Sequence, residues 1–215
     1  MANNGKTPEA TVQRLPVYLY RLQALQEQGV ERVSSRELAE ELKITPSRLR
    51  QDFHCFGGFS QPGKPYAVNH LVTRLREILG LEGETPFIIA GAGHLGQAIA
   101  NYNQFSTDGF RMVGLFDSNP RLEGLAINGV PVRNMDALPK QVEKLNVKLG
   151  IVAVPPQVAQ KVTDKMIAAG ITGIWNFAPV NLRVPPNVFL QDEFLSVGLM
   201  TLRFKMKGPS GKPCP

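Results

Sequence analysis

The stretch FIIAGAGHLG, residues 87–96, decides the fold of the larger part of this chain. Its first four residues form a short apolar run, which is typical of a buried parallel strand. The pattern G-x-G-x-x-G follows at once, and apolar residues at helical spacing continue to Tyr102. In such a turn Gly91 permits the tight bend, Gly93 lets the backbone approach a pyrophosphate, and Gly96 lets helix and strand pack closely. The strand before the motif and the helix after it predict a dinucleotide-binding turn with phosphates at the helix N-terminus.

An acidic residue follows the second predicted strand, residues 111–116. Asp117 comes roughly 20 residues after Gly96, where a carboxylate accepts hydrogen bonds from the adenosine ribose and repels a 2′-phosphate. The sequence therefore favours NAD over NADP, although Arg121 lies nearby and weakens the preference. The alternative interpretation of Asp117 is a polar residue in a strand-end turn.

Strands and helices continue to alternate after Asp117. A helix is expected near residues 138–145, a strand over 149–154, a helix after Pro155-Pro156 and a strand over 171–177. This alternation predicts an α/β fold with a Rossmann-type doubly wound parallel sheet, whose ligands bind beyond the carboxyl ends of the strands. The expected cofactor contacts are Gly91, Ala92, Gly93, His94, Leu95, Gly96, Asp117, Val154, Pro155, Asn176, Phe177 and Ala178.

The N-terminal part reads as short helices, the first over residues 12–28. Ser34 with Glu37 has the capping-box pattern, and Thr45-Pro46 is a second helix start. Two short helices joined by residues 43–44 indicate a helix-turn-helix. The face of the second of these helices that we expect to be buried holds Leu49, Phe53 and Phe56, with Asp52 off to the side. The opposite face, suited to base edges and phosphates, holds Ser47, Arg50, Gln51 and His54.

Turn-forming residues follow this helix pair. Residues 57–66 favour a β-hairpin wing that offers Lys64 and Tyr66 to phosphates, and Arg48 adds a further basic side chain. The alternative is a small helical bundle with a surface loop. We expect a winged helix-turn-helix domain over residues 1–80 and a Rossmann domain over 85–190.

The C-terminal stretch, residues 192–206, reads as a helix that is apolar nearly all round. Such a helix needs cover on more than one side. Either it wedges against its own domain or a second subunit covers it, and we favour a homodimer through a helix over 191–206. Residues 207–215 are expected to be a disordered tail.

Composition excludes several classes of protein. With 215 residues, 43% hydrophobic and 20% charged, the chain is not a disordered, fibrous or membrane-embedded one. The net charge of +6 suggests a polyanionic partner, which a few basic side chains gathered by folding must bind. Two cysteines make neither a disulfide framework nor a four-ligand metal site. Without a signal peptide or a bilayer-length apolar run, we expect a soluble cytoplasmic protein that binds no metal and no membrane.

No residue set supplies the proton donor that a dehydrogenase needs beside the hydride. A Tyr-x-x-x-Lys pair is absent, since Ser106 stands four residues after Tyr102, and His94 more readily meets phosphate than substrate. We therefore expect a protein that binds NAD(H) without being an enzyme. The alternative is a small NAD-dependent oxidoreductase with an N-terminal interaction module.

Several segments together resemble the redox-sensing transcriptional repressor family Rex, over nearly the whole chain. They are Arg14-Leu15-Pro16, Val33-Ser34-Ser35, the glycine turn, Phe116-Asp117, Ala153-Val154-Pro155 and the long block GIWNFAPV, residues 173–180. The resemblance implies a homodimeric repressor with winged helices, a swapped C-terminal helix, and release of operator DNA when NADH binds. By position, Tyr102 resembles the family's tyrosine near the nicotinamide. The residues that resemble its DNA contacts are Arg14, Arg50, Gly63 and Tyr66.

The chain also departs from the family pattern. It has Arg50-Gln51 where the family has Arg-Lys, and Gln61-Pro62 in a wing that is usually basic. The family pairs an arginine on the first helix with an aspartate that opens the last helix, and Tyr20 and Phe194 stand at those positions. A shift of register would instead pair Arg21 with Glu193 or Asp192. The sequence thus resembles a divergent or paralogous member, and an alternative is a paralog with an altered or lost response to DNA or NADH.

Overall fold

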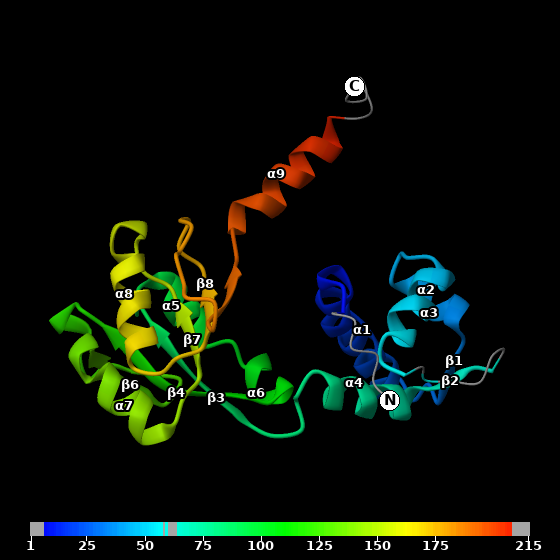
Figure 1. Cartoon of the computed structure of the whole chain (residues 1–215), viewed down its shortest axis with the longest axis horizontal. Helices are drawn as coiled ribbons and strands as arrows, with labels where there is room; N and C mark the ends of the chain where they lie inside the picture. Colours follow the sequence, from blue (N-terminus) through cyan, green and yellow to red (C-terminus); the bar gives the residue numbers. More distant parts are fainter. Residues whose placement is uncertain (1–6, 58, 60–63, 208–215) are drawn as a thin grey trace. The chain divides into compact units, whose positions relative to one another are not determined.

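The computed structural model describes residues 7–57, 59 and 64–207. It divides into two compact units, residues 1–83 and 84–215 (Figure 1). The expectations for Gly63, for Gln61-Pro62 and for the tail from residue 208 onward lie outside the described residues.

The N-terminal unit packs helices around one apolar core, in which leucines from α1, α2, α3 and α4 are fully buried together. Its elements are α1 (Glu9–Glu27), β1 (Arg32–Val33), α2 (Ser35–Glu41), α3 (Pro46–His54), β2 (Tyr66–Ala67) and α4 (Val68–Ile78). Both predicted helix starts are confirmed. Ser34 and Glu37 form a capping box at α2, and the Thr45 side chain accepts a hydrogen bond from the backbone of Arg48 at α3.

A short antiparallel pair joins the segment before α2 to the start of α4. Arg32 lies opposite Ala67, and Val33 lies opposite Tyr66. Residues 58 and 60–63 of the expected hairpin lie outside the described residues, and the strand at its end, β2, pairs with β1. The pairing buries Tyr66, whose ring meets Phe53 edge to face with 5.5 Å between ring centroids.

The C-terminal unit is built on one sheet. In the described part of the chain its strands are β3 (Thr85–Ala90), β4 (Phe110–Asp117), β5 (Ala126–Ile127), β6 (Val130–Asn134), β7 (Leu149–Val152), β8 (Gly173–Asn176) and β9 (Phe189–Asp192). Their order is β5-β6-β4-β3-β7-β8-β9, and all neighbours except β5 and β6 are parallel. From the central β3 the chain builds outward to β4 and β6, then crosses to β7 on the other side. The expected doubly wound parallel sheet is confirmed.

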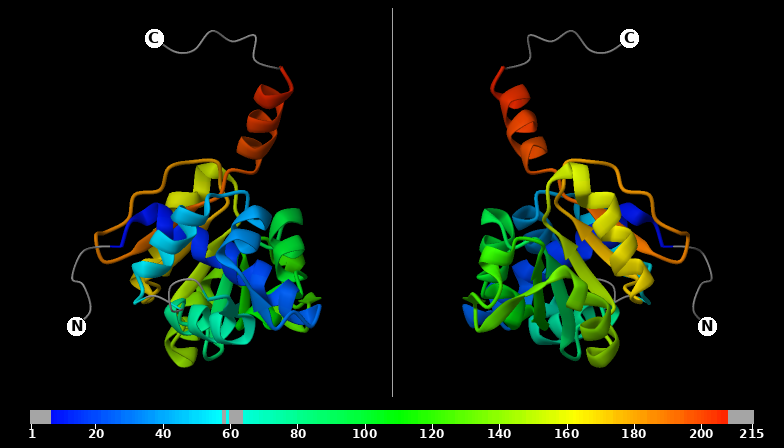
Figure 2. Two further views of the ribbon diagram at one scale, coloured as in Figure 1. Left: turned by 90° about the vertical axis from the view of Figure 1, so that its right-hand side faces the viewer. Right: turned by 90° about the vertical axis from the view of Figure 1, so that its left-hand side faces the viewer.

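Helices cover both faces of this sheet (Figures 1 and 2). They are α5 (His94–Ala100), α6 (Gln104–Asp108), α7 (Leu138–Leu145) and α8 (Pro156–Ala168), with 3-10 turns at Pro120–Leu122 and Met135–Ala137. Ile88 and Ala90 pack with α7 and α8, whereas Phe87 and Ile89 pack with α5. Successive side chains of β3 therefore serve two separate cores, as the two-residue period of a strand requires.

Some boundaries differ from the sequence expectations. The strands expected over 149–154 and 171–177 are shorter, since β7 ends at Val152 and β8 runs from Gly173 to Asn176. The last helix begins at Leu195, not at Asp192, because residues 189–192 form the edge strand β9 alongside β8. Strands β5 and β6 and helix α6 are short elements that the apolar periodicity does not predict.

The last helix, α9 (Leu195–Met206), is apolar nearly all round, as predicted. It extends away from the sheet of its own unit (Figures 1 and 2) and does not wedge against it. Its exposed apolar side chains include Leu195, Leu199, Met200, Leu202, Phe204 and Met206. Within the described residues, no helix combines the length and the apolar character needed to cross a membrane.

We expect Gly96→Ala to destabilise the C-terminal unit strongly, whereas Gly93→Ala leaves its fold intact. A Cβ at residue 96 would lie 1.8 Å from the carbonyl oxygen of Gly91, while a Cβ at residue 93 would meet nothing within 4 Å. Overpacking of this kind costs about 1–3 kcal/mol or more, and the helix cap at Gly93 loses under about 1 kcal/mol. Urea unfolding of both variants measures the difference, and equal destabilisation would contradict the close-approach argument.

Candidate nucleotide site and nucleic-acid interface

The chain passes from β3 to α5 through a turn held against two neighbouring strands. The Gly91 N–H donates to the Phe116 carbonyl at 2.7 Å, and the Ala153 N–H donates to the Ala90 carbonyl at 2.8 Å. Gly91 has a φ of +105°, and a Cβ there would lie 2.3 Å from the carbonyl oxygen of Ala153. Gly93, the N-cap of α5, has open space beside it. Open space next to the first N–H groups of a helix is what a bound pyrophosphate requires.

The carboxylate of Asp117 lies beside this turn. Its Oδ2 accepts the Ala92 N–H at 2.7 Å, and its Oδ1 accepts the Asn119 N–H at 2.7 Å. The Asp117 carboxylate thus lies next to the glycine turn, and its bond to the Asn119 N–H also fits the alternative of a polar residue in a strand-end turn, so its contact with a ribose stays a prediction. Arg121 is exposed in the following 3-10 turn, where its backbone N–H donates to the Asn119 side chain.

The carboxyl ends of β7 and β8 border the same edge of the sheet. Val154 is near enough to the turn that a Cβ on Gly91 would lie 3.0 Å from its side chain. Asn176, at the end of β8, is fully buried, and its Oδ1 accepts the Ala178 N–H at 2.9 Å. Its Nδ2 donates to Asp192 Oδ1 at 2.7 Å. One buried amide therefore holds the loop after β8 and ties it to β9, just before α9 begins.

A row of aromatic rings connects the end of α5 with the loop after β8. Tyr102 and Phe105 have ring centroids 5.0 Å apart, Phe105 and Trp175 are 6.2 Å apart, and Trp175 and Phe177 are 4.6 Å apart. Tyr102 is exposed at one end of this row. The structure thus links two expected cofactor contacts, Tyr102 and Phe177, through rings that belong to the core on the α5 side.

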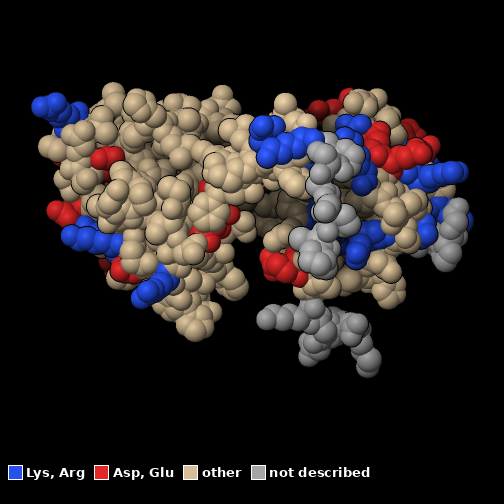
Figure 3. Space-filling model, turned by 90° about the horizontal axis from the view of Figure 1, so that it is seen from above, with Lys and Arg blue, Asp and Glu red and all other residues tan. Residues whose placement is uncertain are grey.

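The outer face of α3 is placed as predicted. Leu49 and Phe53 are buried, and the exposed side chains of the helix are Ser47, Arg48, Arg50, Gln51 and His54. Arg50 Nη1 donates to Ser35 Oγ at 3.2 Å, which links this face to α2, and Lys64 is exposed. In Figure 3 the N-terminal unit, on the right, carries Lys and Arg side chains with acidic ones between them. Guanidinium, hydroxyl and amide groups on an exposed helix are suited to a nucleic acid.

The remaining face of α3 holds a buried carboxylate. Asp52 is 1% exposed and receives four hydrogen bonds from α1. Arg14 donates through Nε and Nη2, both at 2.7 Å, Tyr18 Oη donates at 2.6 Å, and Thr11 Oγ1 donates at 3.0 Å. Burial alone would raise the pKa of Asp52, but the hydrogen bonds from Arg14, Tyr18 and Thr11 together hold that pKa below its ordinary value.

The prediction that Asp52 lies off to the side of α3 was wrong, because the structure buries this side chain against α1. At about 100° per residue, Asp52 lies closer around the helix to the buried Leu49 than to the exposed Ser47. That spacing was the available sequence signal. It did not identify partners, because the donors are 34 to 41 residues away in the chain.

Two expected DNA contacts occupy unexpected positions. The Tyr66 ring is in the core, with only 6% of the residue exposed, and the Arg14 guanidinium is engaged by Asp52. The third, Gly63, lies outside the described residues.

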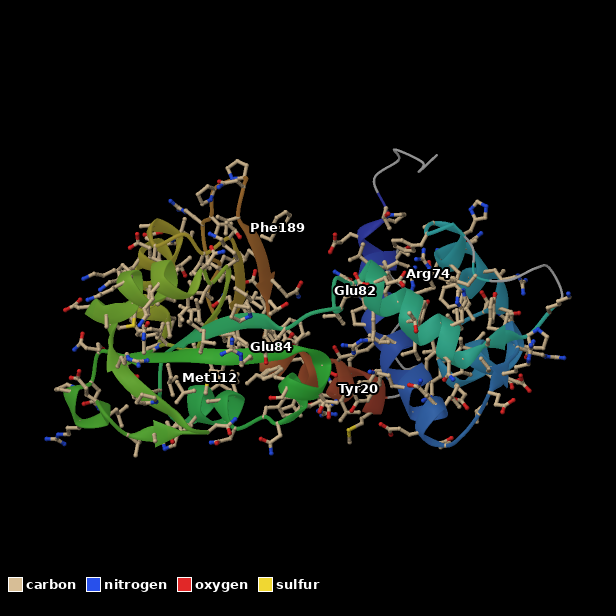
Figure 4. The ribbon with its side chains drawn as sticks, turned by 90° about the horizontal axis from the view of Figure 1, so that it is seen from below. Tyr20, Arg74, Glu82, Glu84, Met112 and Phe189 are labelled. Carbon is tan, nitrogen blue, oxygen red and sulfur yellow. The ribbon has the colours of Figure 1, made fainter. Side chains whose placement is uncertain are left out.

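Tyr20 and Phe194 stand at the positions of the family's ion pair. Tyr20 is exposed on α1 (Figure 4), and Phe194 precedes α9. The alternative register pairs Arg21 with Glu193 or Asp192, and both Arg21 and Asp192 have partners within their own units. Arg21 pairs with Glu41, and Asp192 accepts the Asn176 amide.

Comparison with known proteins covers both units. The model of a family described as "CoA binding domain" matches residues 82–180, and one described as "Putative DNA-binding protein N-terminus" matches residues 6–54. The redox-sensing transcriptional repressor Rex of Clostridium tetani is 45% identical over 197 residues, which cover 92% of this chain and 93% of the relative. Its counterpart from Thermoanaerobacter pseudethanolicus is 42% identical over 96% of this chain and 92% of its own length.

Solved structures are similar over the same span. A structure of the repressor RSP in complex with NADH has a TM-score of 0.87 and 40% identity, and covers 93% of this chain and 94% of its own. A structure of RSP with NAD+ and operator DNA has a TM-score of 0.88 and 40% identity, and covers 97% of this chain and 100% of its own.

The buried network predicts a loss of stability at high pH. Burial, and next the hydrogen bond to Asp52, raise the pKa of Tyr18 from 10.0 to about 12. Because the neutral phenol is favoured in the folded state, its contribution is complete below pH 10 and is lost as the pH rises toward 12. We expect the difference in unfolding free energy between wild type and Tyr18→Phe to shrink by up to about 2 kcal/mol over this range. Urea unfolding from pH 8 to pH 12 measures it, and a constant difference would show that Tyr18 has an ordinary pKa.

Proposed function

This chain belongs to the Rex family of redox-sensing transcriptional repressors, and we propose that it binds operator DNA through its N-terminal unit and NAD(H) through its C-terminal unit. The relatives are named as transcriptional repressors and not as enzymes. One observation carries the proposal: a repressor solved with NAD+ and operator DNA aligns with 97% of this chain. Both units, and not the nucleotide fold alone, are therefore shared.

The nucleotide site that we propose lies at the carboxyl ends of β3, β4, β7 and β8. Its pyrophosphate would lie beside Gly93 and the first N–H groups of α5, and its ribose beside Asp117. Support comes from the open space at Gly93 and from the position of the Asp117 carboxylate next to the glycine turn. The proposed contacts are Gly91, Ala92, Gly93, His94, Leu95, Gly96, Tyr102, Asp117, Val154, Pro155, Asn176, Phe177 and Ala178. A carboxylate at Asp117 favours NAD(H) over its 2′-phosphorylated form.

The DNA surface that we propose is the exposed face of α3 with the following segment. Its contacts are Ser47, Arg48, Arg50, Gln51 and Lys64, together with Gly63 outside the described residues. Arg50 is the best placed to read a guanine, because it is exposed and its guanidinium can donate two parallel hydrogen bonds. Gln51 carries a neutral amide at the position where the family has a lysine. This face therefore has one positive charge fewer, and its binding to DNA depends less on attraction to the phosphates. A repressor acts on DNA, which supports the cytoplasmic location.

A homodimer provides the switch in this proposal. The exposed apolar surface of α9 supports cover by a second copy of the chain, and two winged helices would then meet two half-sites. In this proposal NADH binds more tightly to the arrangement of the dimer that does not fit DNA. It therefore shifts the dimer toward that arrangement and releases the DNA. A tenfold preference is worth only about 1.4 kcal/mol, so a useful switch needs a larger difference in affinity.

We expect NADH to weaken DNA binding while NAD+ does not. A duplex recovered from a random library by the purified protein serves as the probe, and fluorescence anisotropy with NADH, NAD+ or ATP measures its affinity. If NADH leaves the affinity unchanged, the switch is contradicted although DNA binding stands. If no duplex is enriched, the DNA-binding proposal itself fails.

We expect Asp117→Asn to weaken NADH binding about tenfold, because a charged hydrogen-bond acceptor for the ribose is lost. The affinity for NADPH relative to NADH should rise at the same time, since the repulsion of a 2′-phosphate is removed. Asp108→Asn on α6 is the matched control and should change neither value. Calorimetric titration with both nucleotides decides, and an unchanged NADH affinity in Asp117→Asn would remove Asp117 from the site.

A further inference from the structure

The buried carboxylate of Asp52 is the only group on α3, in the part of the chain that the structure describes, with side-chain hydrogen bonds to α1. The apolar contacts of Leu49 and Phe53 hold α3 against the core but are not directional. Hydrogen bonds weaken steeply away from their preferred angles. Four bonds from three residues of α1 therefore restrict how far α3 can rotate about its axis.

The rotation of α3 determines where its outer face points. Arg50 and Gln51 directly precede Asp52 in the helix. Because all three belong to one rigid helical turn, a rotation that breaks the Asp52 bonds also moves the two outer side chains. Readout of base edges depends on the position of those side chains, whereas attraction to phosphates depends mainly on charge.

The Arg14 guanidinium forms an ion pair with Asp52 inside the N-terminal unit. Its Nε and Nη2 both donate to Asp52, and Nη2 also lies 3.3 Å from Thr11 Oγ1. The side chain of Arg14 is 25% exposed and that of Asp52 is 2% exposed. The positive charge of Arg14 is thus balanced inside the unit by a buried carboxylate, and among the described residues Arg14 is the only cation that forms an ion pair with it.

We propose that Asp52 is a positioning residue for sequence recognition, and that Arg14 is its internal partner and not a ligand of the DNA backbone. This inference rests on the proposed function, because it concerns how the α3 face reads DNA. According to this proposal, the contact between α1 and α3 contributes to the DNA-sequence specificity of the protein.

The test compares Arg14→Met, Asp52→Leu and the double variant Arg14→Met/Asp52→Leu on the duplex selected by the wild type and on a scrambled duplex. Arg14→Met leaves the buried Asp52 carboxylate without its cation, and Asp52→Leu leaves the partly exposed Arg14 guanidinium without its carboxylate. The double variant replaces the pair by apolar groups of similar size. We expect each single variant to lose about tenfold or more in the ratio of selected to scrambled affinity, as misplaced base contacts do. The double variant should keep the wild-type dependence of affinity on salt.

Salt dependence separates the two roles of Arg14. Loss of one phosphate contact reduces the slope of log affinity against log salt by about 1. A reduced slope in the double variant, with an unchanged selected-to-scrambled ratio, would overturn the proposal. Global destabilisation would lower both affinities alike through the folded fraction, so the ratio also distinguishes positioning from a merely structural role.

Arg14→Lys keeps the proposal testable if the double variant does not fold. Lysine retains a charge for a phosphate but not the paired Nε and Nη2 bonds. We expect a reduced selected-to-scrambled ratio with an unchanged salt slope, and full retention of the ratio would contradict the proposal. Arg21→Gln, which breaks the exposed pair of Arg21 and Glu41, is the matched control and should alter neither value. Failure of the wild type to bind any duplex would instead count against the proposed function.

Discussion

The close approach of three chain segments at the glycine turn is the constraint on which the nucleotide unit depends. At Gly91 the backbone comes so near to the end of β7 that a Cβ would lie 2.3 Å from a carbonyl oxygen. At Gly96 the first turn of α5 comes still nearer to the glycine turn, since a Cβ there would lie 1.8 Å from the Gly91 carbonyl oxygen. Because α5 can approach in this way, its N-terminus points at the space beside Gly93 and the sheet can continue outward on both sides of β3. A side chain at either position would move the helix whose N–H groups face the phosphates.

A polar interaction has the corresponding role in the N-terminal unit. The core there is mostly leucine, which packs well but tolerates sliding and rotation of helices. The contact of Asp52 with Arg14, Tyr18 and Thr11 adds direction to that packing. A buried charge is costly unless it is fully bonded, and here the carboxylate receives four donors. The fold thus accepts the cost of burying one charge on α3, the helix that carries the proposed DNA-contacting face.

The last helix, α9, has an apolar surface that a single copy of the chain leaves exposed. Its apolar residues lie on all sides, and no described element of its own unit covers them. The path to this helix starts at the nucleotide edge, because Asn176 bonds both the loop after β8 and Asp192 at the end of β9. A change in the loop after β8 therefore has a short route to the helix that we propose forms the dimer.

Local patterns in the sequence were enough for the helix caps, the buried strand β3, the glycine turn and the outer face of α3. Each depends on residues within one or two turns of one another, so composition and spacing carry the information. The strand β9, the burial of Tyr66 and the hydrogen-bond partners of Asp52 could not be obtained in this way. Residues 189–192 become a strand only because β8 offers an open edge, and Asp52 is buried only because α1 brings donors from 34 to 41 residues away. The sequence by itself determined which groups are present, and the tertiary structure decided that Arg14 is paired with Asp52, because only folding brings a charge and its partner together.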